Sequence, residues 1–257
     1  MYVACLMAGA SSRLLPLTKV NHKSLLRVGN LRVIDVQMKT FALAGLDTFS
    51  FVVGHGGSRL ANHLLANYSS VAVSIINNNY FASRNLDWSA YLALSSRRDD
   101  VMYYEGDIIA APDIIRQVAM HSGDVCVAMD TGIQSARVDT RVLVGDDRVS
   151  ELVFSEHGDL DRTSATSSGG EFLCFAKLSN RAREYVVKRL EKQPCDGPMK
   201  LYGIFNDLFQ QYPSHVVTAA GRPWVEIDNK DDLLRARAIV DRIFTTQPAD
   251  TSHMNHD

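Results

Sequence analysis

The sequence lacks a long apolar run, a large charge of either sign and a cluster of cysteines. No apolar segment approaches the ~20 residues that span a membrane, and the start of the chain has neither the basic residues nor the cleavage site of a signal peptide. We therefore expect a cytoplasmic protein with no membrane partner. The formal net charge of -2 argues against bulk nucleic-acid binding, so any anion site must be local.

The few cysteines do not form a ligand set. They show no CxxC pair and no metal-ligand spacing, and three of them lie in apolar runs typical of strands; the full set is Cys5, Cys126, Cys174 and Cys195. This pattern predicts buried, reduced thiols. His253 and His256 lie in a polar tail without cysteines or a carboxylate framework, so we do not expect them to bind a metal.

What is present is the composition of a globular protein. With 257 residues, 46% hydrophobic and 22% charged, the chain can bury a substantial core, and one domain is the simplest expectation. Strand-like runs alternate with amphipathic helical stretches, and the runs are Tyr2 to Met7, Thr48 to Val53, Val71 to Ile76, Val101 to Tyr104 and Asp124 to Met129. The alternation predicts an α/β fold, a Rossmann-like three-layer sandwich with a mixed, mostly parallel central sheet and helices on both faces.

The sequence also predicts several helices and, after residue 140, a pair of strands. A helix is expected from Val33 to Ala44, ended by Gly45, with one face formed by Val33, Val36, Met38, Phe41 and Ala42. Beyond residue 140, paired strands near Arg141 to Val144 and Val149 to Phe154, followed by DLDRTSATSSGG, predict a small β insertion over the sheet. Later helices are expected at about Asn180 to Glu191, Lys200 to Gln211 and Lys230 to Phe244. We expect one domain over residues 1–244 and a disordered tail over 245–257.

The stretch after the first strand points to a negatively charged ligand. The turn Ala8-Gly9-Ala10-Ser11-Ser12 has almost no side-chain bulk, so backbone N–H groups can converge on phosphate oxygens. Arg13 can bind two phosphate oxygens at once, and Lys23 supplies a mobile point charge. The same residues also fit a plain strand-to-helix turn with two surface cations.

The whole stretch, LMAGASSRLLPLTKVNHKSLL, resembles the signature L-A-A-G-x-G-x-R-L-x-P-L-T, then P-K-x-L-L, that opens the nucleotidyltransferases. Ser11 stands where the second glycine is usual, and His22 replaces the proline before the lysine. A Cβ therefore enters the turn, and a rigid φ is lost before Lys23. The resemblance implies that the nucleotide is bound by Leu6, Ala8, Gly9, Ala10, Ser11, Ser12, Arg13 and Lys23.

Two later motifs extend the resemblance. YYEGDII is similar to the strand-end G-D of this family, and GRPWVEIDNKDDLLRA is similar to its W-x-E-I-D close, which implies that Asp107 and Asp228 bind Mg²⁺. Both residues follow predicted strands, and two carboxylates suit an ion whose other ligands are water and phosphate oxygens. The structural alternatives are a turn residue for Asp107 and, for Asp228, a helix N-cap with Asp231 as the capping-box carboxylate.

Base and acceptor contacts are implied by the middle of the chain. IINNNYFASRNLDWSAYLAL occupies the place where this family reads the base, and Asn78, Asn85 and Ser89 are the candidate partners, although an asparagine run is also typical of turns. For the acceptor we expect a carboxylate-and-aromatic surface around an ammonium head, formed by Asp87, Glu171, Tyr202, Trp224 and Glu226. Trp224 and Trp88 are equally compatible with ordinary packing.

Together with G-G-E-F at residues 169–172, these motifs resemble the small cytidylyltransferases that activate phosphocholine or 2-aminoethylphosphonate and related phosphonates. The resemblance implies Mg²⁺-dependent transfer of CMP from CTP to a small phosphorylated or phosphonate acceptor, including a hydroxyalkyl phosphonate, with pyrophosphate leaving. Catalysis would rest on Arg13, Lys23, Asp107 and Asp228. A sugar-1-phosphate nucleotidyltransferase and a non-catalytic nucleotide-binding module stay open as alternatives, as does a homodimer. A glycosyltransferase fits less well, because no D-x-D follows Gly106.

Overall fold

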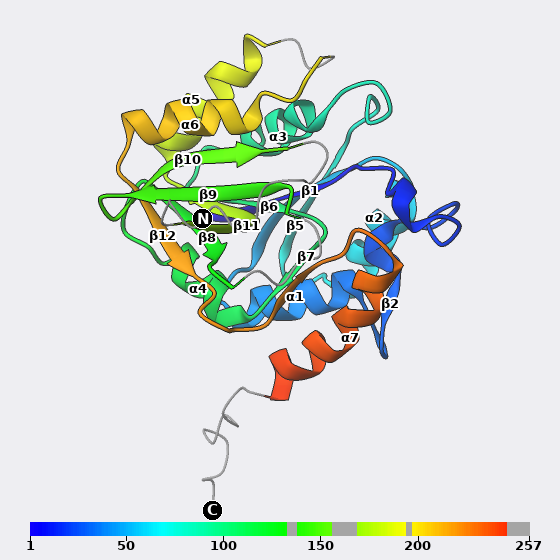
Figure 1. The fold of residues 1–257 in the computed structure, drawn as a ribbon. Coiled ribbons are helices and arrows are strands. Elements are labelled where there is room, and N and C mark those ends of the chain that lie inside the picture. The colour runs from blue at the N-terminus through cyan, green and yellow to red at the C-terminus, as the bar shows by residue number, and fades with distance from the viewer. Residues whose placement is uncertain (133–137, 156–168, 194–196, 246–257) are drawn as a thin grey trace, which may run out of the picture.

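The computed structural model describes residues 1–132, 138–155, 169–193 and 197–245 (Figure 1). Most of the DLDRTSATSSGG stretch, Cys195 and the tail from residue 246 onward lie outside the described residues. Within them, no helix combines the length and the apolar character needed to cross a bilayer.

The core of the molecule is a parallel sheet centred on β1 (Tyr2–Met7). β1 pairs in parallel with β4 (Thr48–Val53) and with β6 (Val101–Glu105), and β4 pairs in parallel with β5 (Ala72–Asn77). All residues of β1 are buried, which explains its uninterrupted apolar sequence, because helices cover both faces of such a strand. The four strands lie within a residue or two of the predicted ranges.

The sheet continues with antiparallel pairing on the other side of β6. There, β11 (Gly169–Leu178) runs antiparallel to both β6 and β8 (Val125–Asp130), and β12 (Ser214–Thr218) lies parallel to β8. Cys174 adopts φ 55, and the register with β8 shifts between Phe172 and Ala176. β11 is therefore irregular at this point. Because β11 pairs antiparallel with its neighbours, the sheet is mixed, and it is parallel in its first half, as predicted.

The predicted strand pair after residue 140 forms, but its position corrects one expectation. β9 (Thr140–Gly145) and β10 (Arg148–Phe154) pair antiparallel around Asp146 and Asp147, whose φ values of 49 and 60 are those of a tight hairpin turn. β9 then pairs with the first residues of β11, so this insertion extends the edge of the sheet instead of lying over it. The reason is that β11 reaches beyond its pairing with β6 and its free edge takes up another strand.

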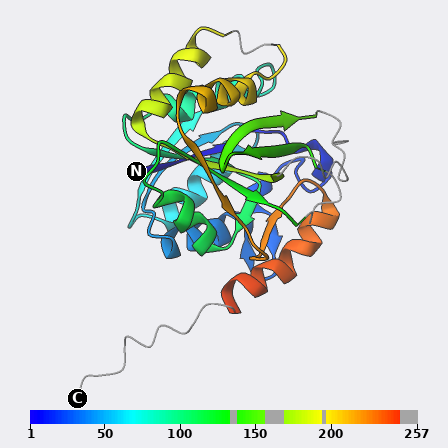
Figure 2. The ribbon, with the colours of Figure 1, turned by 60° about the vertical axis from the view of Figure 1, so that its left-hand side comes forward.

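Helices form the two outer layers (Figure 1). One layer contains α1 (Val33–Leu43), α2 (Gly57–Asn67) and α4 (Pro112–Ala119), as right-handed crossovers between the parallel strands require. The other contains α3 (Leu86–Ser95), α5 (Asn180–Glu191) and α6 (Leu201–Gln211), which contact one another. The turned view shows α5 and α6 on one side of the sheet and α7 (Lys230–Thr245) at the opposite end of the molecule (Figure 2). In α1, Ala42 is exposed instead of buried, and Gln37 is buried.

Four short elements lie near the carboxyl edge of the sheet. β7 (Ile108–Ala110) pairs antiparallel with β13 (Trp224–Glu226), and β2 (Arg27–Val28) pairs with β3 (Leu31–Arg32). Two single 3-10 turns, η1 (Ser12–Leu14) and η2 (Lys23–Leu25), lie in the segment that carries the opening motif. These elements bring the three sequence motifs to one place.

Candidate active site

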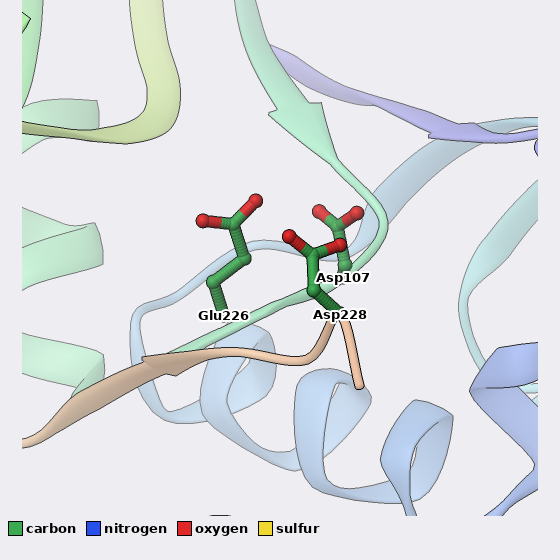
Figure 3. Close-up of side chains that lie close together, drawn as sticks. All are labelled: Asp107, Glu226 and Asp228. Carbon is green, nitrogen blue, oxygen red and sulfur yellow. The ribbon is translucent and has the colours of Figure 1, made fainter. Parts of the chain in front are cut away.

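Three carboxylates meet where β7 and β13 pair (Figure 3). Asp107 immediately precedes β7, Glu226 ends β13, and Asp228 follows two residues later. In the antiparallel pairing of β7 with β13, Glu226 lies opposite Ile108, and the N–H of Ile227 donates to the carbonyl oxygen of Asp107 at 3.0 Å. One oxygen from each carboxylate lies within 4.8 Å of the others. The strand pair therefore joins the second and third motifs into one acidic group.

The turn that carries Asp107 is held from two sides. Gly106 donates its N–H to the carbonyl oxygen of Leu6, and a Cβ at this glycine would lie 2.4 Å from the Met7 side chain. From α1, the buried amide of Gln37 donates to the carbonyl oxygens of Gly106 and Ile108 at 3.0 and 2.8 Å. Gln37 thus fixes the backbone on both sides of Asp107, a role that the sequence interpretation did not include.

Both predicted cations lie at these carboxylates. Lys23 Nζ donates to Asp107 Oδ2 at 2.9 Å and to the carbonyl oxygen of Ile227 at 2.9 Å, and its side chain is 12% exposed. Arg13 donates to Asp228 Oδ1 at 2.9 Å, and its side chain is 52% exposed. The two ion pairs bring Arg13, Lys23, Asp107 and Asp228 together.

The electrostatics of the group reflect crowding of like charges. Burial, together with the nearby Asp107 charge, raises the pKa of Asp228 to about 6, and the same two causes raise the pKa of Glu226 well above its usual range. Burial alone would lower the pKa of Lys23, but Asp107 and Asp228 raise it above its ordinary value. Lys23 is therefore charged, while Asp228 and Glu226 are destabilised in their ionised form.

His22 is anchored, which corrects the expectation that losing the proline loosens the approach to Lys23. Its φ of -69 lies in the range that proline would impose. The ring is buried, with Nδ1 accepting from the N–H of Ser24 at 3.1 Å and Nε2 at 2.7 Å from the carbonyl oxygen of Met7. Since Nδ1 accepts, Nε2 donates. Burial lowers the pKa of His22 to about 4, so the ring is neutral at physiological pH.

The turn of the opening motif has a backbone conformation that favours glycine at one position. Ser11 adopts φ 50, the left-handed conformation that glycine enters without steric cost. Its carbonyl oxygen accepts from the hydroxyl of Thr18 at 2.9 Å, which fixes the turn. The backbone N–H groups of residues 9–12 donate to no other described residue. They are therefore available to an anion.

A cavity of about 550 Å³ opens beside the carboxylates. One part of its wall is acidic and contains Glu105, Asp139 and Glu171 in addition to the three clustered carboxylates. Another part is aromatic, because Tyr202 meets Phe154 and Phe172 edge-on with ring centroids 5.4 and 6.1 Å apart. Ser12, Arg13, Thr140, Cys174, Leu86 and Met199 complete the lining. Of the predicted acceptor residues, Glu171, Tyr202 and Glu226 lie here.

Glu105 is a partly buried carboxylate of this cavity that the sequence interpretation missed. It accepts from the hydroxyls of Tyr103 and Tyr202 at 2.6 and 2.8 Å. Burial and the charge of Asp107 raise its pKa to about 7. A signal was available, because Glu105 ends the strand that leads directly into the G-D motif and stands two residues before Asp107.

Two predicted acceptor residues lie elsewhere and need correction. The Asp87 carboxylate accepts from the N–H groups of Lys200 and Leu201 at the start of α6, so it stabilises that helix end. Trp224 is buried and donates from Nε1 to Asp130 at 2.8 Å. Neither residue lines the cavity, and helix capping and packing explain both.

The candidate base-reading residues use their side chains within the protein. Asn78 donates to the hydroxyl of Ser89 at 3.0 Å, and its amide oxygen accepts from the N–H of Tyr80. The Asn85 oxygen accepts from the N–H of Asp87 as the N-cap of α3. These bonds shape the loop between β5 and α3, and none of the three side chains lines the cavity.

The capping alternative for Asp228 is incorrect. Asn229 accepts from the N–H groups of Asp231 and Asp232 and is the N-cap of α7. The reciprocal carboxylate is Asp232, whose Oδ2 accepts from the N–H groups of Asp228 and Asn229 at 3.0 Å. Asp228 is thus free of capping and directs its carboxylate to Asp107 and Glu226.

The carboxylate group suits a divalent cation. It offers hard oxygen donors from three residues, and Asp107 Oδ1 is buried without a hydrogen-bond partner among the described residues. A cation would also relieve the repulsion that raises the pKa values of Asp228 and Glu226. Glu226 was predicted to bind the acceptor, but its position places it with Asp107 and Asp228 in the carboxylate group.

Residues 3–122 match the nucleotidyl transferase family. This part of the chain, slightly less than half of its length, is therefore similar to that family. Solved structures share its fold over nearly the whole chain. The T. maritima inositol-1-phosphate CTP transferase is 16% identical, with 96% of this chain and 97% of that chain covered and a TM-score of 0.75. The Streptococcus pneumoniae CTP:phosphocholine cytidylyltransferase is 18% identical, with 93% and 98% covered and a TM-score of 0.70.

A UDP-glucose pyrophosphorylase bound to UDP-glucose is 11% identical to the chain, with 96% and 99% covered and a TM-score of 0.73. No curated protein matches the sequence. At these identities the solved structures establish the fold, and they differ in nucleotide and acceptor. The choice of substrate must therefore be argued from the site itself.

Proposed function

We propose that this nucleotidyltransferase transfers CMP from CTP to a small phosphorylated or phosphonate acceptor that carries an ammonium group, such as phosphocholine or 2-aminoethylphosphonate. The observation that carries the proposal is the cavity beside the carboxylate group, where three aromatic rings stand next to Glu105 and Glu171. Aromatic faces and carboxylates attract a cationic head. A hydroxyalkyl phosphonate would fit the space but lacks the cationic group that these side chains attract.

In the reaction, an oxygen of the acceptor's phosphate or phosphonate forms a bond to the α-phosphorus of CTP, and the bond to the β-phosphate oxygen breaks. The acceptor is already anionic at neutral pH, so no general base is needed. Lys23, inside the carboxylate group, stabilises charge at the α-phosphate, and Arg13, at its exposed side, binds the leaving pyrophosphate. The free N–H groups of residues 9–12 bind phosphate oxygens beside Arg13.

Asp107, Glu226 and Asp228 would hold Mg²⁺, which neutralises phosphate charge when bound. Gln37 and the ladder between β7 and β13 keep these carboxylates in place. The role of this chain's own residues is therefore to position three carboxylates and two cations around one phosphate.

CTP is proposed as the nucleotide, with the loop that contains Asn78, Asn85 and Ser89 reading the base. Because their side chains bond within the loop, the backbone groups that they hold in place are the proposed contacts. Two of the three similar structures described above are named for CTP, which supports this choice.

A sugar-1-phosphate acceptor is the second candidate. It is favoured by the number of carboxylates in the cavity, since carboxylate oxygens also accept hydrogen bonds from hydroxyl groups. The UDP-glucose pyrophosphorylase fold likeness is compatible with it.

The decisive experiment is a screen of pyrophosphate release with Mg²⁺ and each of the four NTPs. The acceptors are phosphocholine, 2-aminoethylphosphonate, 2-hydroxyethylphosphonate and hexose 1-phosphates. We expect turnover with CTP and an ammonium-bearing acceptor. Turnover only with a hexose 1-phosphate would replace the proposal by the second candidate, and no turnover with any pair would favour a non-catalytic binding protein.

A further inference from the structure

A second cavity, of about 390 Å³, lies on another part of the surface and shares no lining residue with the first. It is formed by the segment that leads into η2, by the β2–β3 hairpin and by α2. Its lining residues are Asn21, Leu25, Arg27, Arg32, Arg59 and Asn62. Three of the six carry a guanidinium group.

None of these arginines forms a salt bridge with a carboxylate of the described residues. Arg59 donates to the amide oxygen of Asn21 at 2.7 Å, and Arg27 donates to the carbonyl oxygen of Asn30 at 3.2 Å. Arg32 lies 3.3 Å from His63 Nδ1. The cavity therefore concentrates three guanidinium groups, none of which is paired with a carboxylate among the described residues.

The carboxylate of this neighbourhood is already engaged. Asp35 accepts from the Tyr68 hydroxyl at 2.8 Å and from the backbone N–H of Arg32 at 3.2 Å, and it lies 2.6 Å from His63 Nε2. Each guanidinium has five N–H donors, of which the contacts above use few. The remaining donors can face an anion in the cavity.

We propose that this cavity binds a small polyphosphate anion of the pyrophosphate class. Each guanidinium group can bind two phosphate oxygens at once. Three guanidinium groups together match the negative charge of a polyphosphate, which is larger than that of a ligand with a single carboxylate. The six lining residues include no aromatic ring on which a base could stack, so the ligand is a polyphosphate without a nucleobase. The volume lies in the range of small-ligand sites.

The site lies behind the segment that carries Lys23. Asn21 and Leu25 line the cavity, whereas Lys23 between them reaches Asp107 on the other side. An anion that draws Arg59 from Asn21 changes a contact two residues from Lys23. The ligand is thus placed to influence the carboxylate group through this segment.

The experiment is calorimetric titration of pyrophosphate at constant ionic strength, without Mg²⁺, acceptor or turnover. Four proteins are compared: the wild type, Arg27→Gln/Arg59→Gln, Arg13→Ala, which removes the proposed pyrophosphate contact of the active site, and the control Arg148→Gln/Lys188→Gln, which loses the same charge at exposed positions elsewhere. We expect a binding event that Arg13→Ala retains and that Arg27→Gln/Arg59→Gln weakens at least tenfold. The control should bind like the wild type.

Pyrophosphate binding that Arg13→Ala abolishes entirely, or that the control weakens as much as the arginine pair does, would overturn the proposal. If the Arg13→Ala protein binds CTP more tightly than pyrophosphate, and Arg27→Gln/Arg59→Gln loses this CTP binding, the ligand would carry a nucleobase, contrary to the proposal. Arg27 and Arg59 are exposed, so the variants should keep the wild-type Tm. Arg59→Lys, which keeps the charge but not the paired donors, should bind with intermediate affinity.

Discussion

Lys23 Nζ lies 2.9 Å from Asp107 Oδ2, and the same amine donates to the carbonyl oxygen of Ile227. One side chain of the opening motif therefore contacts both of the later motifs. The contact makes the role of Lys23 testable apart from that of Arg13, which lies at the exposed side of the same group.

Lys23→Ala should lower kcat by about 100-fold or more and change the apparent KM for CTP less, because charge builds at the α-phosphate only during the reaction. Arg13→Ala should raise the apparent KM for CTP as well as slow turnover, since it is proposed to bind the β- and γ-phosphates. Steady-state kinetics of both variants measure the difference. An unchanged kcat in Lys23→Ala would show that this lysine only neutralises Asp107.

Asp107→Asn and Asp228→Asn should each reduce turnover by orders of magnitude while leaving the fold intact, because their carboxylates lie at strand ends and project into the cavity. Glu226→Gln should have a similar effect, as expected for a third ligand. Activity and Mn²⁺ binding measure the loss, and Tm serves as the control. Wild-type rates in any of the three would remove that residue from the metal site.

Replacing His22 by proline should preserve kcat better than replacing it by alanine. Both substitutions remove the ring's bonds to Met7 and Ser24, at a cost of about 1–3 kcal/mol, and both should lower Tm. His22→Pro keeps φ near -69, so it should retain kcat within a few-fold, whereas His22→Ala should lose more. Equal kcat values in the two variants would show that backbone restraint before Lys23 is unimportant.

The carboxylate group should make stability fall as pH rises in the absence of divalent metal. The pKa of Asp228 is about 6 in the folded chain against an ordinary value of 3.8, so the folded state holds its proton more tightly than the unfolded state. Its contribution is complete below about pH 3.8 and is lost as pH rises through about 6. Thermal melts from pH 4 to 8 should show a shallower fall in Asp228→Asn. Mg²⁺ should stabilise the wild type more at pH 7.5 than at pH 5.

The central strands and helices could be predicted because each depends on local periodicity. β1, β4 and α5 have the predicted bounds, and the strand ranges of β5 and β6 differ by one residue at their ends. The pairing of β9 with β11 could not be predicted, because it joins residues far apart in the sequence.

Some residues of the candidate site could likewise be predicted from the sequence, and others could not. Arg13, Lys23, Asp107 and Asp228 follow ordered motifs, and the structure brings them together. Gln37 and Phe154 depend on tertiary packing alone, and the N–H groups that Asp87 caps lie more than a hundred residues away, so no local pattern shows these roles.

Glu105 provides the sharpest test of the ammonium-bearing acceptor. The pair 2-aminoethylphosphonate and 2-hydroxyethylphosphonate differs chiefly in the cationic group, and Glu105→Gln removes the charge while keeping a polar side chain of similar size between the hydroxyls of Tyr103 and Tyr202. We expect the KM for the amino compound to rise by roughly 10- to 100-fold, which corresponds to the loss of a charged hydrogen bond of about 1.5–3 kcal/mol. The KM for the hydroxy compound should stay within a few-fold. An equal effect on both acceptors would mean that Glu105 supports the fold of the cavity and does not bind the cationic head. In that case Tyr103→Phe, which removes one of the two hydroxyls that donate to Glu105, would also affect both acceptors alike.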